Sequence, residues 1–243
     1  MSGAELLGVA LIAAGAATVQ LIAGFGFALA AVPLFSVVID PHDAVIVSLG
    51  IAMFTSGAQA WVGRAATDRT VAGSMLTGAA VGLPVGWAVF TWADDRVLGV
   101  VIGVAVLVSV VLIARGLDLR HAGRGLDLGA GAFSGALTMS SSVNGPPLVF
   151  TLQARQFGPV RFRSTITTVF AVLDVVGIII FALSGEIGGD ELTAIAVALP
   201  GVGVGAAAGI GLRRYLSPAR FRGVVLVLLV IAGVTAIVSA LTR

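Results

Sequence analysis

The sequence predicts an all-α polytopic membrane protein made of two inverted repeats, each a broken helix hairpin followed by three transmembrane helices. Composition, segment length and charge distribution support this fold class. Of the 243 residues, 58% are hydrophobic and 11% are charged, and the mean hydropathy is +1.10. Soluble domains carry about 25% charged residues, so this chain has too few charges to cover a surface in water. A water-soluble fold is therefore excluded.

Eight apolar segments follow one another along the chain. Most are close to the ~20 residues that cross a bilayer as a helix. The first segment would be about 54 Å long as one helix, at a rise of ~1.5 Å per residue, and the fifth is also long. Both carry a glycine or proline break near the centre, so we expect hairpins there. The segments lie at about 4–39, 44–63, 70–93, 97–114, 128–154, 160–185, 192–212 and 220–242.

The arginines decide the topology. All 14 basic residues are Arg, and they split 8 against 6 if every segment crosses once. If the first and fifth segments are hairpins, 12 of the 14 share one face, in loops 63–70, 115–127, 155–163 and 213–222. The positive-inside rule favours the second arrangement and makes these loops cytoplasmic. We therefore expect a multi-pass protein of a bacterial-type inner (plasma) membrane, with three crossings per half that invert the second half relative to the first.

A duplication is indicated by short motifs that recur in the same order. Pro33-Leu34 corresponds to Pro147-Leu148, and Asp40-Pro41 to Gly158-Pro159 at the start of the next span. Gly82 and Gly86 correspond to Gly205 and Gly209, and we interpret these pairs as helix-packing motifs. The predicted organisation is a first repeat over 1–115, a cytoplasmic linker over 116–127 and a second repeat over 128–243.

Several site classes are excluded or unsupported. There is no Cys, and the two His residues, His42 and His121, fall in predicted loops, so we expect neither a metal site nor a cofactor. The pI of about 10.4 does not indicate nucleic-acid binding, because the arginines lie in short loops between apolar segments. An intramembrane enzyme lacks the residues for a catalytic dyad. The expected partners are the lipid bilayer and a small anionic substrate, and a homo-oligomer is left open.

The break in the fifth segment is the strongest candidate site. Hydroxyl and amide side chains crowd in front of Gly145-Pro146-Pro147: Thr138, Ser140, Ser141, Ser142 and Asn144. A half-helix that starts near Pro146 would direct its positive N-terminal end into the membrane. Hydroxyls and helix N-termini bind oxyanions without a buried cation. The alternative is that these small residues only allow close helix packing.

The break in the first segment offers fewer side chains. Gln20, Gly24, Phe25 and Gly26 can supply backbone N–H groups and close approach to a substrate, as the counterpart of the second break. The alternative is a helix kink without a ligand.

Asp174 is the only acidic residue deep inside a predicted span. A carboxylate there costs several kcal/mol unless it is paired, hydrated or protonated, so Asp174 is a candidate for proton coupling; the alternative is a neutral acid bonded to a neighbouring helix. On the offset that aligns Pro41 with Pro159, its repeat mate is Ser56. Ser56 and Gln59 are candidate cavity residues, against a packing role. Arg161 and Arg163 could attract anions at the cytoplasmic mouth or only set orientation.

Over nearly its whole length the chain resembles the TauE/SafE family of sulfite-exporter-type permeases. The residues that carry the resemblance are Gly24-Phe25-Gly26, Pro33-Leu34, Ser48-Leu49, Asp68, Gly82 to Gly86, Gly135, Asn144 to Leu148 and Arg163-Ser164-Thr165. Phe27 and Ala28 depart from the glycines common there. The resemblance implies export of a small sulfur-containing anion, such as sulfite or an organosulfonate. We expect alternating access between the two breaks, with protons as the candidate coupling ion; the alternative is a carrier or channel for another small anion or metabolite.

Overall fold

The computed structural model describes residues 1–23, 26–115, 123–213 and 218–242. Within these ranges the chain is helical and contains no strand, which confirms the all-α part of the predicted fold class. Five of the described helices are long and apolar enough to cross a membrane: α1, α3, α4, α8 and α9. The elements are α1 (Gly3–Ala23), α2 (Ala28–Val38), α3 (Pro41–Gly63), the 3-10 turn η1 (Arg64–Ala66), α4 (Arg69–Trp92), α5 (Asp95–Arg115), α6 (Arg124–Ser141), α7 (Gly145–Ala154), α8 (Pro159–Leu183), α9 (Gly189–Arg213) and α10 (Pro218–Thr242).

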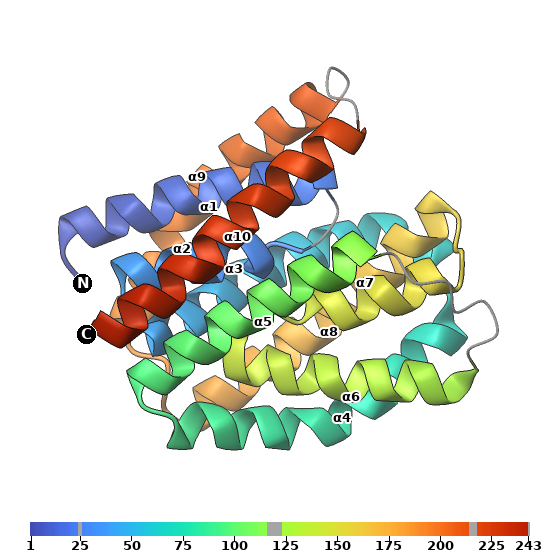
Figure 1. Cartoon of the computed structure of the whole chain (residues 1–243), viewed down its shortest axis with the longest axis horizontal. Helices are drawn as coiled ribbons and strands as arrows, with labels where there is room; N and C mark the ends of the chain where they lie inside the picture. Colours follow the sequence, from blue (N-terminus) through green and yellow to red (C-terminus); the bar gives the residue numbers. More distant parts are fainter. Residues whose placement is uncertain (24–25, 116–122, 214–217, 243) are drawn as a thin grey trace.

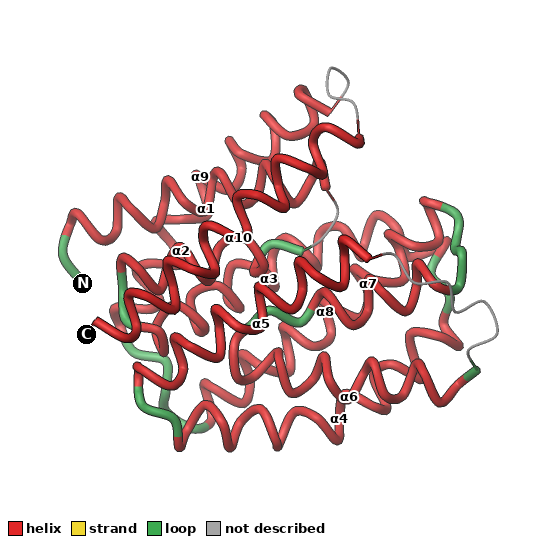
Figure 2. Tube along the Cα trace, in the orientation of Figure 1, coloured by secondary structure: helices red, strands yellow, loops and turns green. Residues whose placement is uncertain are grey.

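The two long apolar segments are both broken in the middle, as predicted. The first is divided into α1 and α2, and the second into α6 and α7, and the two helices of each pair contact each other. Figure 2 shows the short non-helical stretches within the bundle, away from the ends where the other connections lie. Pro41 and Pro159 are the first residues of α3 and α8, because proline fits the first turn of a helix, where its missing N–H is not needed. Pro33, in contrast, lies inside α2 and not at its start.

The described connections gather at two opposite ends of the bundle (Figure 1). Both termini and the α2–α3, α4–α5 and α8–α9 connections lie at one end, and the α3–α4 and α7–α8 connections lie at the other. At that second end the Thr67 hydroxyl donates to the Ser164 carbonyl at 3.2 Å, and the Asp68 N–H donates to the Thr165 hydroxyl at 3.0 Å. The described part of the predicted arginine-rich face therefore forms one end of the molecule. We call it the arginine-rich end.

Each broken hairpin packs against a helix of the other half. α1 packs on α9, and α6 packs on α4, while α3 pairs with α8 and α5 with α10. The glycine motifs make these contacts: a Cβ on Gly82 would overlap the Ala132 carbonyl, and a Cβ on Gly205 would overlap the Ala14 carbonyl. The predicted packing role is thus confirmed for both glycines. If each helix of the first half is exchanged for its counterpart in the second, the same four helix pairs result. A duplicated chain with a two-fold axis would have this property. Inversion of the halves stays a prediction.

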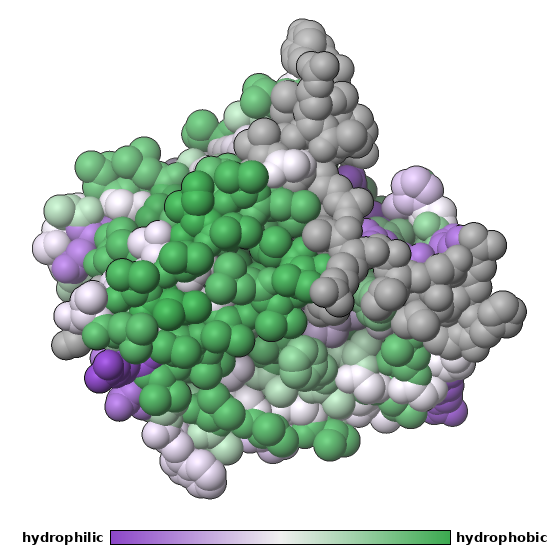
Figure 3. Space-filling view, in the orientation of Figure 1, coloured by the Kyte–Doolittle hydropathy of each residue, from purple (hydrophilic) through white to green (hydrophobic). Residues whose placement is uncertain are grey.

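The outer surface fits a lipid environment. Figure 3 shows a face over α5 and α10 that is covered with hydrophobic residues, with hydrophilic residues toward the ends. Val104, Val108, Leu228 and Ile231 on these helices are each 45–57% exposed. Apolar side chains this exposed along whole helices are expected where lipid, and not water, is the surrounding solvent.

Candidate functional site

The second break is built by residues 142–144, between α6 and α7. Ser142 has φ 56°, in the left-handed region, and its N–H donates to the Thr138 carbonyl at 3.1 Å. A residue other than glycine is uncommon in this conformation, so the turn is held by its surroundings. The Ser134 hydroxyl donates to the Asn144 carbonyl at 2.7 Å and fixes the backbone at the exit of the turn. The chain therefore leaves α6 and starts α7 in one defined geometry.

The start of α7 offers fewer backbone donors than the sequence pattern indicated. α7 begins at Gly145, and Pro146 and Pro147 occupy the next two positions. Proline has no N–H, so among these three residues only Gly145 carries one. Because both prolines lie in the first turn, this helix start has fewer free N–H groups than most helices do. An anion here would be held mainly by side chains.

The predicted hydroxyls are all buried, but most of them are already hydrogen-bonded. Thr138, Ser140 and Ser141 donate to carbonyls one turn earlier in α6, at 2.8–3.1 Å. The Ser142 hydroxyl is the exception: it is buried and has no hydrogen-bond partner among the described residues. Ser142 is thus the serine of this run whose hydroxyl remains available to a ligand.

Asp174 lies against this break, deep in α8. It is 2% exposed, accepts a hydrogen bond from the Ser56 hydroxyl at 2.8 Å and accepts a second from the Asn144 amide at 3.4 Å. Both partners are uncharged. The structure therefore joins three predicted site residues, from α3, α8 and the second break, into one buried cluster. The contact between Ser56 and Asp174, which are repeat mates, is what a two-fold axis passing between α3 and α8 would give.

The first break faces the same side of α8. Gly26 has φ +95°, a conformation that suits glycine, and a Cβ at this position would lie 3.6 Å from the ring of Phe170. Phe170 precedes Asp174 by one helical turn, so the two breaks lie against neighbouring turns of α8. Gly24 and Phe25 lie outside the described residues. Gln20 is buried and lines a cavity of about 290 Å³ between α1, α3 and α9.

A larger cavity, of about 740 Å³, opens at the arginine-rich end between α1, α3 and α8. Gln59, Arg163, Ser164 and Thr167 contribute its polar lining. Gln59 also lines the cavity that contains Gln20, and it lies one turn from Ser56 along α3. The described cavities therefore reach from the arginine-rich end to within one helical turn of the buried cluster.

The two arginines at this mouth have different surroundings. Arg163 lines the larger cavity. Arg161 instead forms an ion pair with Asp68 and lies over the ring of Phe157 at 4.5 Å. The structure thus gives Arg161 a part in joining α8 to the start of α4. Only Arg163 lies where it can meet a solute in the cavity.

Asp68 caps α4 and provides a pH-dependent contact at this end. Burial opposes ionisation of its carboxyl, but the N–H groups of Val71 and Thr70 and the Arg161 guanidinium outweigh this and lower the pKa of Asp68. A folded-state pKa below the unfolded value of about 4 means that the carboxylate stabilises the fold above that value. This stabilisation is lost as the pH falls through the folded-state pKa.

We therefore expect Asp68→Ala to lower the unfolding free energy by about 1 kcal/mol at neutral pH, the usual effect of losing an N-cap. The difference from the wild-type chain should shrink once the pH falls below about 4. Thermal unfolding of both proteins in detergent, from neutral pH to below about pH 4, measures this difference in stability. A difference that stays constant down to about pH 3 would contradict the assignment.

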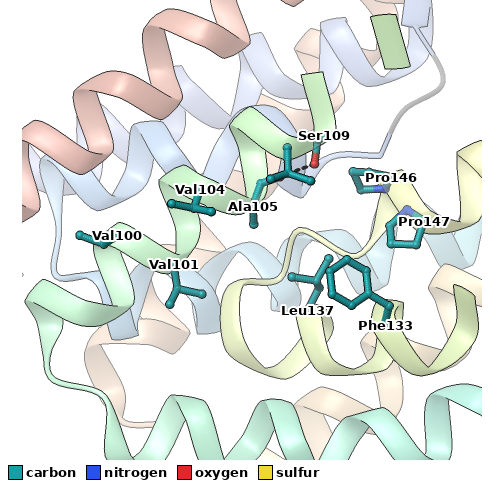
Figure 4. Close-up of a pocket in the computed structure, with 10 residues that line it drawn as sticks. Val100, Val101, Val104, Ala105, Ser109, Phe133, Leu137, Pro146 and Pro147 are labelled. Atoms are coloured by element: carbon teal, nitrogen blue, oxygen red, sulfur yellow. Dashed lines mark hydrogen bonds between the residues drawn. The ribbon is translucent and has the colours of Figure 1, made fainter. Parts of the chain in front are cut away.

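A third cavity is apolar and does not suit an anion. It has a volume of about 260 Å³ and lies between α5 and the α6/α7 hairpin, beside Pro146 and Pro147 (Figure 4). Its polar residue, Ser109, donates its hydroxyl to the Ala105 carbonyl of its own helix. This cavity, between α5 and the two prolines, is therefore separate from the polar cluster around Asp174.

Some functional-site neighbours were missed by the sequence analysis. Asp127, in the first turn of α6, forms a bidentate ion pair with Arg155 at the end of α7, at 2.9 and 2.7 Å. This pair closes the base of the hairpin. It could have been predicted, because an acid and an arginine stand at the two ends of the fifth predicted segment. Ser134 could have been recognised as a further hydroxyl one turn before Thr138. Ser48, which the sequence analysis used only for the family resemblance, has a buried hydroxyl without a partner among the described residues.

Metal ligands do not gather in the part of the chain that the structure describes: no three His, Asp or Glu side chains there could hold a metal ion together. The polar groups at the second break are hydroxyls, the Asn144 amide and the Asp174 carboxyl. Such groups can bind an oxyanion and carry a proton.

Comparison with known protein families gives a match. The family model described as "Sulfite exporter TauE/SafE" matches residues 9–236, which is nearly the whole chain. No curated protein and no solved structure matches.

Proposed function

Because the chain belongs to the sulfite exporter TauE/SafE family and is thus a multi-pass membrane transporter of that type, we propose that it exports sulfite or a related organosulfonate. The observation that supports this proposal best is the buried cluster of Ser56, Asn144 and Asp174 at the second break. The cluster puts polar groups in the middle of an apolar bundle. Burial of polar groups there costs free energy, so they usually mark a functional site.

The proposed binding site lies between the two breaks and α8. The donors are the Asn144 amide, the Ser142 hydroxyl and the Ser56 hydroxyl. The run Thr138, Ser140 and Ser141 supplies further hydroxyls if the α6 tip moves, and Gly26 allows close approach from the first break. Oxyanions of sulfur accept several hydrogen bonds at once, which suits a cluster of uncharged donors.

The proposed route runs through the cavity at the arginine-rich end, past Arg163 and Gln59. A positive charge at the mouth of a cavity raises the local concentration of anions. We propose that this end is cytoplasmic, that Arg163 attracts the anion, and that rocking of one half against the other exposes the site to the other side. Asp174 is the proposed proton-carrying group.

Transport by site variants tests the proposal. We expect Ser140→Ala/Asn144→Ala to reduce sulfite efflux from proteoliposomes at least about tenfold, because loss of a hydrogen bond to a charged group is worth roughly 1.5–3 kcal/mol. Ser36→Ala/Ser109→Ala is the matched control, since both hydroxyls are buried and donate to carbonyls of their own helices. Equal efflux from the site variant and the wild-type protein would reject this site. Competition by a panel of carboxylates, sulfate and thiosulfate separates sulfonates from other anions.

A further inference from the structure

The donors that suit an anion at the second break are occupied by the protein's own carboxylate. Ser56 and Asn144 both donate to Asp174, one to each carboxylate oxygen, at 2.8 and 3.4 Å. The backbone carbonyl of Asn144 is held separately, by the Ser134 hydroxyl at 2.7 Å. The Asn144 side chain can therefore leave Asp174 while the turn that carries it keeps its geometry.

Asp174 has no cationic partner among the described residues. Its contacts that affect ionisation are the two uncharged donors. The charged groups on the elements packed against α8, and on α8 itself, all lie near the ends of those elements: His42 and Asp43 on α3, Arg64 on η1, Asp68 and Arg69 at the start of α4, Arg124 and Asp127 on α6, Arg155 after α7, and Arg161 and Arg163 on α8. The ionised carboxylate thus depends on the two donors for its stabilisation.

We propose, as an extension of the proposed function, that Asp174 and the transported anion compete for the Asn144 amide and the Ser56 hydroxyl, so that each anion moves together with one proton on Asp174. The ionised carboxylate, in this proposal, keeps both donors through the two hydrogen bonds of the structure. When a proton binds to one carboxylate oxygen, the carboxyl becomes neutral and releases the donors to the incoming anion.

The physical reason is that two negative charges cannot share this cluster. An anion bound to Asn144 would lie within a few ångströms of Asp174, in a region with few charges to compensate for their repulsion. It would also deprive the carboxylate of its donors, which leaves a buried charge without a partner. Protonation removes both penalties. The anion and the proton are then bound and released together, in the same direction.

This mechanism predicts how binding depends on pH. The probe is methanesulfonate, which stays a monoanion between roughly pH 5 and 8, so only the protein titrates. Its dissociation constant for the wild-type protein, from ligand-induced thermal shifts, should rise by up to about tenfold per pH unit toward alkaline pH, because one proton is bound with each anion. For Asp174→Asn, which keeps a neutral side chain of the same shape, the constant should not change with pH.

Flux measurements give the second readout. In proteoliposomes with an internal pH dye, wild-type efflux of methanesulfonate should alkalinise the lumen and ignore an imposed membrane potential, since a monoanion and a proton carry no net charge. Asp174→Asn should still move the anion, without a pH change and with a rate that follows the potential. Glu186→Gln, which converts an exposed carboxyl to an amide, is the matched control and should behave as the wild-type protein does.

The outcomes separate this inference from the proposed function. If sulfite and methanesulfonate neither bind nor move at any pH, the proposed function fails. If they bind and move but wild-type affinity is independent of pH, or efflux acidifies the lumen, competition at Asp174 is wrong while anion transport stands. Wild-type binding decides the question even if Asp174→Asn does not fold.

Discussion

Replacing Asp127 by Asn is expected to lower the unfolding free energy by about 3 kcal/mol. The change leaves Arg155 without its counter-charge at a site where the arginine side chain is 21% exposed and the aspartate side chain 3%. Removing one partner of a buried ion pair usually costs roughly 3–5 kcal/mol, and partial exposure of the arginine places this pair at the lower end. Chemical or thermal unfolding in detergent measures the effect.

Two further variants show whether the lost charge is the cause. Asp127→Asn/Arg155→Gln removes both charges and should recover much of the lost stability, because no unpaired charge remains. Arg161→Gln breaks the neighbouring pair with Asp68, in which the arginine side chain is 58% exposed, and should cost at most about 1 kcal/mol. If Asp127→Asn is as stable as the wild-type protein, the pair does not hold the hairpin closed.

Adding a single methyl group at Gly82 should destabilise the protein by about 2–3 kcal/mol. The new Cβ of Gly82→Ala would overlap the Ala132 carbonyl and lie 2.8 Å from the Ala136 nitrogen. These are backbone atoms of α6, so no side chain can turn away. α4 and α6 must separate, and overpacking of this kind usually costs roughly 1–3 kcal/mol. The midpoint of thermal unfolding should fall.

Gly73→Ala is the control for this substitution on the same helix. Nothing lies within 4 Å of a Cβ at Gly73, so the methyl group is free of contacts there. Alanine favours a helix over glycine by up to about 1 kcal/mol, and Gly73→Ala should therefore be neutral or stabilising. Equal destabilisation by the two substitutions would show that helix packing is not what Gly82 provides.

Much of the fold could be predicted because a bilayer allows few solutions. A segment as long as 4–39 cannot cross once, and the glycines after Ala23 mark where it is broken. The distribution of arginines then favoured hairpins over single crossings. Helix partners could not be predicted in the same way: which helix receives Gly82 or Gly205 depends on side-chain shape across the bundle, and a single sequence does not encode that as a local pattern.

The candidate site could be predicted in part. The hydroxyl-rich break and Asp174 were recognised because polar residues are rare in apolar segments. That Ser56 and Asn144 both donate to Asp174 depends on how α3, α8 and the second break pack together, and this proximity cannot be seen in the sequence. Ser140 and Ser141 illustrate a second limit, because their hydroxyls donate to carbonyls of their own helix. A hydroxyl in a helix can satisfy itself on the carbonyl one turn earlier, so their presence did not show that they face a ligand.

The pairing of α1 with α9 has a consequence for synthesis of the chain. After Ala23, the last residue of α1, about 165 more residues must be synthesised before α9 begins at Gly189. Translation proceeds at roughly 5–20 residues per second. The first helix therefore exists for roughly ten seconds or longer before α9, the helix on which Ala14 packs, has been made. α6 meets α4 as soon as it emerges, because α4 is already in place. Assembly of the nascent protein is thus unequal in its two halves, and of the helices in these four pairs the N-terminal one depends longest on lipid or the insertion machinery before its partner is made.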